Sequence, residues 1–195
     1  MKGKILIAVP TFENIQPEVF KAIYNIKSEH ELGFDFVRGY DCAVARNNIG
    51  KIAEANSYDY VLMVDSDTIV PPNVLDLMLD PPVDVCLGVC PRKNTKDGKT
   101  AIVKLNSTAY HDNYYYSDLP NERTKIKGGG FACALIKSSV FTKLDYPWFQ
   151  YVTNNDYSTL SEDYYFCQNC AMFDVDIWLE PRVRCGHLAR YYQFE

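Results

Sequence analysis

The chain has 195 residues, of which 47% are hydrophobic and 23% are charged. Such values are ordinary for a globular protein and exclude wholesale disorder, collagen-like repetition and a coiled coil. The formal net charge of −5 at pH 7 gives no overall attraction to nucleic acid or to anionic membranes. Because a domain takes about 150 residues, the length predicts one domain over residues 1–195.

Two features of the chain bear on its location. The apolar run Ile5–Val9 is shorter than the core of a signal peptide, which takes about 7–15 residues, and no other run approaches the roughly 20 residues of a membrane helix. Seven cysteines, an odd number, favour reduced thiols over a disulfide framework. We therefore expect a soluble, cytoplasmic protein with no membrane span.

The first part of the chain alternates between strand-like and helix-like segments. The apolar runs Ile5–Val9 and Tyr60–Val64 predict buried strands, and a further strand is expected over residues 34–37. Between them, a helix opening at Pro17 and a second one over residues 43–55 are predicted. The order strand, helix, strand, helix, strand predicts an α/β domain with a mostly parallel sheet.

The rest of the chain has a different pattern. Residues 91–127 are polar and rich in turn formers, which predicts antiparallel hairpins. The other predicted elements are a short helix after Pro71–Pro72, a strand over residues 84–90, an apolar stretch over 131–136, a helix over 161–173 and a closing strand over 175–180.

Asp65-Ser66-Asp67 directly follows a predicted buried strand. In an open α/β sheet, ligands bind at the carboxyl ends of the strands. Two carboxylates one residue apart can share a hard divalent cation there, although a polar loop with a helix cap fits the same residues.

A second group of polar residues is expected at the same edge. Pro10, Thr11 and Glu13 follow the first strand, and Arg46 lies in the first turn of the second helix. Backbone N–H groups and an arginine suit a nucleotide diphosphate. Taken alone, Arg46 also fits a solvated charge on the face of a helix.

Several segments, taken in order, resemble those of GT-A glycosyltransferases. Within that group, the pattern most resembles the large nucleotide-sugar family 2. They are Ile5–Thr11, Ala45–Asn47, Tyr60–Asp67, Gly129–Phe131, Ser161–Asp163 and Gly186–His187. The resemblance implies a GT-A (Rossmann-like) α/β fold, with a mostly parallel central sheet flanked by helices and a small antiparallel hairpin region in the second half. It implies a nucleotide-binding half over residues 1–90 and an acceptor-binding, catalytic half over 91–195.

The resemblance also implies a transfer reaction and its residues. A sugar would move from a nucleotide diphosphate, UDP by the family's habit, to a hydroxyl acceptor with the help of Mn²⁺ or Mg²⁺. Asp67 would be a direct metal ligand, Asp65 would lie near the ribose and the metal, and His187 would be a further ligand, although a lone histidine is often structural. The donor would also contact Pro10, Thr11, Glu13, Arg46, Ser66, Gly129 and Gly130.

The pair Glu162-Asp163 opens a predicted helix after Ser161. Acidic residues there complement the helix dipole. The family pattern implies in addition that Asp163 is the general base, with Glu162 as the alternate.

The aromatic loop before this pair contains Trp148 and Tyr151. Aromatic faces pack on sugars, so these two residues are candidates for an acceptor platform, and packing of the loop onto the domain is the alternative. The acceptor itself is left open: a saccharide, a protein side chain, a lipid-linked sugar or a modified DNA base.

Three other functions compete with this interpretation. Cys167, Cys170, Cys185 and His187 could hold a structural zinc ion, although the first two also suit a helix facing the core. A nucleotidyltransferase would use the same sheet edge, but the Gly-rich loop that it needs after the first strand is missing. A non-catalytic sugar- or nucleotide-binding module would keep the pocket without turnover.

Overall fold

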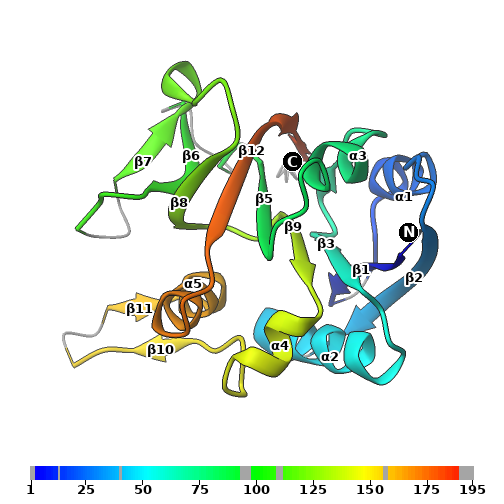
Figure 1. Cartoon of the computed structure of the whole chain (residues 1–195), viewed down its shortest axis with the longest axis horizontal. Coiled ribbons are helices and arrows are strands. Elements are labelled where there is room, and N and C mark those ends of the chain that lie inside the picture. Colours follow the sequence, from blue (N-terminus) through cyan, green and yellow to red (C-terminus); the bar gives the residue numbers. More distant parts are fainter. Residues whose placement is uncertain are drawn as a thin grey trace, which may run out of the picture.

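The computed structural model describes residues 3–12, 14–39, 41–92, 98–108, 112–155 and 158–188 (Figure 1). Glu13, a predicted donor contact, lies outside the described residues. The helices are α1 (Pro17–Tyr24), α2 (Cys42–Ala55), α3 (Val74–Met78), α4 (Ser139–Lys143) and α5 (Glu162–Met172), with a 3₁₀ turn at Tyr116–Asp118. No helix in the described part of the chain is both long and apolar enough to span a membrane.

The described strands form one large sheet and two small ones. The nine-stranded sheet has the order β2-β1-β3-β9-β5-β12-β8-β6-β7, and β10 pairs with β11 and β4 with β13. The strands are β1 (Lys4–Thr11), β2 (Glu31–Arg38), β3 (Tyr60–Val64), β4 (Thr68–Ile69), β5 (Val85–Val89), β6 (Lys99–Lys104), β7 (Asn113–Tyr115), β8 (Thr124–Gly129), β9 (Cys133–Lys137), β10 (Val152–Thr153), β11 (Thr159–Leu160), β12 (Ile177–Arg184) and β13 (Gly186–His187).

The first five elements follow the predicted order. β1 is parallel to both of its neighbours, with Ile5 opposite Leu32 of β2 and Tyr60 of β3. Proline opens α1 at Pro17, and the Asp41 side chain caps α2 by accepting a hydrogen bond of 2.8 Å from the Val44 N–H. The prediction of a strand-helix alternation over this part of the chain is confirmed.

The prediction of a mostly parallel sheet is wrong. In the described sheet, β1 is parallel to β2 and β3, and β5 is parallel to β12, but the other five neighbouring pairs are antiparallel. β9 inserts between β3 and β5 and runs against both. The physical reason is the connection after β5: it folds into the predicted hairpins β6, β7 and β8, and short connections of this kind join antiparallel strands.

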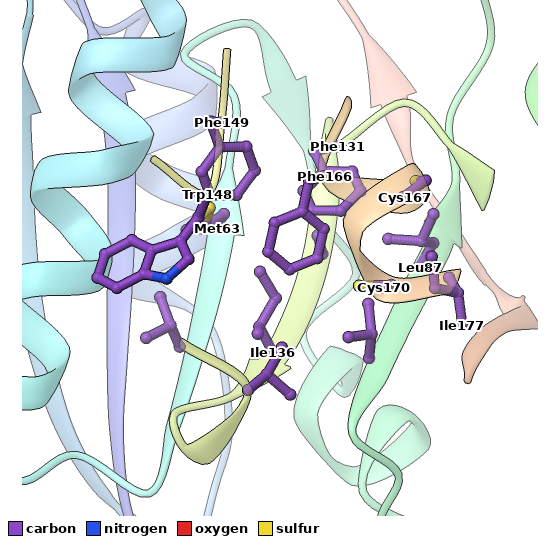
Figure 2. Packing of buried hydrophobic residues seen from close by; sticks show 14 of the residues in the cluster. Met63, Leu87, Phe131, Ile136, Trp148, Phe149, Phe166, Cys167, Cys170 and Ile177 are labelled. Carbon is purple, nitrogen blue, oxygen red and sulfur yellow. The ribbon is translucent and has the colours of Figure 1, made fainter. Parts of the chain in front are cut away.

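Helices cover both faces of the sheet (Figure 1), and each face has its own core. On one face lie α2, α4 and α5, and on the other α1 and α3. Figure 2 shows the first core, in which the Phe149 and Phe166 rings stack with centroids 4.7 Å apart. Trp178 is half-buried in β12 beneath the Lys125 ammonium.

The fold brings distant segments to one edge of the sheet. The carboxyl ends of β1 and β3 lie side by side, because the two strands are paired and parallel. The small pair β4–β13 sets His187 opposite Thr68, immediately after the Asp65-Ser66-Asp67 turn. Residues from both halves of the chain therefore meet at the position where an open α/β sheet binds ligands.

Candidate functional site

Asp67 and His187 form the first element of the site. The His187 Nε2 atom lies 3.4 Å from an Asp67 carboxylate oxygen. Its Nδ1 donates a hydrogen bond of 2.7 Å to the Pro91 carbonyl oxygen, which fixes the ring. The backbone adds a further tie, since the Leu188 N–H donates to the Asp67 carbonyl oxygen at 2.8 Å.

This arrangement determines the charge on the histidine. The hydrogen bond to Asp67, together with contacts to Cys90 and Pro91, raises the pKa of His187 to about 10. These contacts favour the protonated form of the ring. A ring fixed through Nδ1 and directed through Nε2 at a carboxylate is also the arrangement of a metal-binding histidine.

Asp65 is the second carboxylate of the turn, and it is paired with Arg46. The Arg46 guanidinium donates from one terminal nitrogen to Asp65 at 2.9 Å and from the other to Glu162 at 2.5 Å. Arg46 and Glu162 are both buried, whereas Asp65 is half-buried. Burial raises the pKa of Asp65, and the guanidinium opposes that shift.

Asp163 follows Glu162 at the start of α5 and has a different environment. Its carboxylate accepts hydrogen bonds from the Ser161 hydroxyl and from the Tyr164 N–H. Burial raises its pKa, while Arg46 and these two hydrogen bonds act in the opposite direction. A Cβ atom placed on Gly130 would lie 3.5 Å from an Asp163 oxygen, so Gly130 borders this carboxylate.

A cavity of about 400 Å³ opens beside the Asp65-Ser66-Asp67 turn. Four of the predicted residues line it: Pro10, Thr11, Ser66 and Tyr151. The Thr11 hydroxyl is buried and has no hydrogen-bond partner in the described structure. Ala45, part of the Ala45–Asn47 segment, also lines it, whereas sequence reasoning missed Phe12, Gly39, Asp41 and Cys42. Asp41 could have been found, because an aspartate before a helix signals an N-cap.

A second cavity, of about 220 Å³, lies beside His187 and Gly130. Gly129 is packed more tightly, since a Cβ atom there would come within 2.7 Å of the Ile102 side chain. A cavity of about 590 Å³ lies elsewhere: Tyr60 and Lys137 are among its lining residues, at the opposite end of β3 from Asp65.

The structure corrects the role expected for Trp148. Its side chain is 4% exposed and its indole N–H donates to the Phe141 carbonyl oxygen at 2.8 Å, so it belongs to the core and is no acceptor platform (Figure 2). The cause is Asn47, whose amide bonds to the backbone of Trp148 and Phe149 and holds this loop against α2. Tyr151, two residues after Phe149, is 44% exposed.

The zinc alternative also disagrees with the structure. Cys167 and Cys170 lie in the core on the α5 face of the sheet, whereas Cys185 belongs to the core on the opposite face. Within the described ranges, no group of three or more histidine, cysteine or acidic side chains is arranged around a common metal position. Asp67 and His187 are a pair of potential ligands, with Asp65 close by in the same turn.

Comparison with known proteins relates this geometry to a fold. No family model matches the chain, and no curated protein does so. Among solved structures, the A197 protein from STIV is similar with a TM-score of 0.65 at 16% identity, over 97% of this chain and 87% of that one. GalNAc-T7, solved with UDP, GalNAc and Mn²⁺, is similar with a TM-score of 0.64 at 11% identity, over 100% of this chain and 45% of that one. These similarities support a GT-A-like fold.

Proposed function

We propose that the protein is a metal-dependent glycosyltransferase that moves a sugar from a nucleotide diphosphate, UDP in the first instance, to a hydroxyl acceptor. The observation that carries the proposal is the pairing of Asp67 with His187 at the turn whose Ser66 lines the cavity of about 400 Å³. Support also comes from the similarity to GalNAc-T7, which was solved with UDP, GalNAc and Mn²⁺.

The residues present suit a divalent cation. Asp67 and His187 would hold it through carboxylate oxygens and the His187 Nε2 atom, whereas Asp65 is paired with Arg46. An imidazole favours Mn²⁺ over Mg²⁺. A bound cation supplies positive charge that stabilises the leaving diphosphate.

The chain's own groups supply binding and proton transfer. Thr11, Ser66 and Tyr151 line the cavity of about 400 Å³ in which the nucleotide would bind. In the transfer step, the acceptor oxygen forms a bond to the anomeric carbon, the bond from that carbon to the diphosphate breaks, and the acceptor proton passes to Asp163. A carboxylate whose pKa is raised by burial is a stronger base than an exposed one, which suits this task.

Nucleotide binding tests the proposal directly. UDP, GDP, CDP and TDP would each be titrated by calorimetry in Mn²⁺, in Mg²⁺ and with a chelator. We expect one diphosphate to bind in a metal-dependent manner, and Asp67→Asn to remove that dependence. Asp76→Asn, which changes an exposed carboxylate on α3, is the matched control and should bind as the wild type does.

Turnover separates an enzyme from a binding module. A sugar nucleotide that binds should be hydrolysed slowly in Mn²⁺, with water as the acceptor, and Asp163→Asn should stop this reaction without changing nucleotide affinity. Metal-dependent binding with no hydrolysis or transfer to any acceptor would favour the non-catalytic module. Binding of no diphosphate would contradict the donor site itself.

A further inference from the structure

Arg46 is a buried cation at the point where four segments of the chain meet. It is 2% exposed and projects from α2 between Asp65, which follows β3, and Glu162, the first residue of α5. Its guanidinium carbon lies 5.7 Å from the centre of the Phe131 ring. Its third nitrogen, Nε, is buried with no hydrogen-bond partner among the described residues.

Glu162 is occupied on two sides. One of its oxygens accepts from Arg46, and the carboxylate also interacts with the hydroxyl of Tyr151, whose ring lines the cavity of about 400 Å³. Burial and the nearby Glu162 carboxylate raise the pKa of Tyr151, which keeps its hydroxyl protonated and able to donate. The contacts run in series from Asp65 through Arg46 and Glu162 to Tyr151.

A buried charge is costly unless a partner of opposite sign is fixed beside it. Glu162 meets this need for Arg46, so the guanidinium can keep one arm of its planar fork for Asp65. The planar fork can serve both carboxylates at once, which the single ammonium of a lysine cannot do with the same geometry.

We propose that Arg46 and Glu162 are a positioning pair. Arg46 sets the orientation of Asp65, and Glu162 sets that of Arg46 and Tyr151, so the β3 turn, the start of α5 and the cavity wall are fixed relative to one another. This inference rests on the proposed function. It replaces two expectations from the sequence, since Arg46 acts through Asp65 and not on the phosphates, and Glu162 is no alternate base.

The test separates positioning from a contribution to folding. Replacing a buried ion pair by apolar residues of similar volume is often neutral for stability, whereas removing one partner is costly. We therefore compare Arg46→Met, Glu162→Met and the double variant R46M/E162M. Each single variant should melt well below the wild type, and the double variant should recover most of that loss.

Activity should not recover in the same way. In R46M/E162M, Asp65 has lost its partner, and a misplacement of about 1 Å at a reacting centre can cost roughly 100-fold in rate. We expect kcat to remain reduced by roughly that factor while the KM for the acceptor changes little. A double variant that regains both stability and the wild-type kcat would overturn the positioning role.

Two conservative variants keep the inference testable if the double variant does not fold. Glu162→Gln retains an oxygen that can accept from Arg46, and we expect it to keep most of the wild-type kcat. Arg46→Lys should fold but lose at least about tenfold in kcat, because the fork is absent. Wild-type kcat in a folded Arg46→Lys variant would contradict the proposal.

Asn47→Ala is the matched control, since Asn47 is the next residue of α2, is 7% exposed and bonds only to the backbone of Trp148 and Phe149 in the described structure. It should lower the melting temperature without lowering kcat at temperatures where it is folded. Metal-dependent UDP binding of the wild type is measured first. Its absence would remove the proposed function, whereas binding and turnover that are equal in wild type and variants would overturn the positioning role alone.

Discussion

His187 Nε2 and an Asp67 carboxylate oxygen lie 3.4 Å apart, although the two residues are far apart along the chain. The pairing of β13 with β4 produces this proximity, since it places His187 opposite Thr68, the neighbour of Asp67. The hydrogen bond from Nδ1 to the Pro91 carbonyl oxygen then directs Nε2 at the carboxylate. Two potential ligands are thus oriented by backbone contacts that do not depend on a metal.

The first prediction concerns metal affinity. His187→Ala should weaken Mn²⁺-dependent binding of UDP by at least about tenfold. In other metal sites, loss of a residue that only orients a ligand already lowers metal affinity by about 10–100-fold. Calorimetry at fixed UDP with titrated Mn²⁺ measures this effect. His30→Ala is the control: the His30 Nδ1 atom accepts from the Gly3 N–H at 3.0 Å, at the amino end of β1 and far from the turn. Equal losses in both variants would refute a ligand role for His187.

The second prediction concerns the pH dependence of transfer. Burial holds the pKa of Asp163 above its ordinary value, and only the ionised form can accept a proton. The rate should therefore fall as the pH drops through this raised pKa, so the acid limb of kcat lies above that of an exposed aspartate. Ser161→Ala removes a hydrogen bond that stabilises the carboxylate, which should move the limb to still higher pH. A limb that Ser161→Ala leaves unchanged would show that a different group is the base.

The third prediction compares two neighbouring glycines. A Cβ atom on Gly129 would come within 2.7 Å of Ile102 and 3.0 Å of the Ala101 carbonyl oxygen, so Gly129→Ala should destabilise the fold by about 1–3 kcal/mol. On Gly130 the tightest contact is 3.1 Å, to the Ala101 Cβ atom, and Asp163 is the next neighbour. Gly130→Ala should therefore keep more stability and lose more activity. Thermal melting and transfer assays distinguish the two effects, and the reverse ranking would contradict a site beside Gly130.

The sequence predicted those parts of the site that depend on local rules. The position of Asp65 and Asp67 follows from a buried strand that ends in polar residues. The family resemblance implied that Asp67 and His187 act together as metal ligands. In contrast, Glu162, one of the two carboxylate partners of Arg46, is 116 residues away along the chain. No local pattern distinguishes an arginine on a solvated helix face from one that is buried against a distant carboxylate.

Two errors have identifiable physical causes. Residues 133–137 are mostly apolar, and an apolar strand can be buried in a sheet in either orientation. Their hydrophobicity therefore carried no information on whether β9 runs parallel or antiparallel to β3. Trp148 lies in a loop rich in Pro, Asn and Tyr, which suggested an exposed ring. The side chain of Asn47 bonds to that loop and draws the indole into the core, and this contact depends on tertiary structure.

The last prediction concerns a buried ion pair away from the site. Arg123 donates from Nε to Glu180 at 3.1 Å and from its terminal nitrogens to the carbonyl oxygens of Leu77 and Pro81. It thereby joins the start of β8 to β12 and to the segment after α3, and the Glu180 side chain is fully buried. Arg123→Met leaves that carboxylate without one of its partners, and the expected loss is about 3 kcal/mol of unfolding free energy, because breaking a buried pair costs about 3–5 kcal/mol.

The control for this loss is an exposed ion pair between β8 and the residue that precedes β12. Lys125 and Asp176 approach to 2.6 Å, with side chains 44% and 59% exposed. Lys125→Met should cost at most about 1 kcal/mol, since exposed ion pairs contribute about 0–1 kcal/mol and solvent screens them. Urea denaturation of both variants measures the difference. Similar losses of unfolding free energy in Arg123→Met and Lys125→Met would contradict this prediction. The three contacts of Arg123 would then add no more stability than one exposed ion pair.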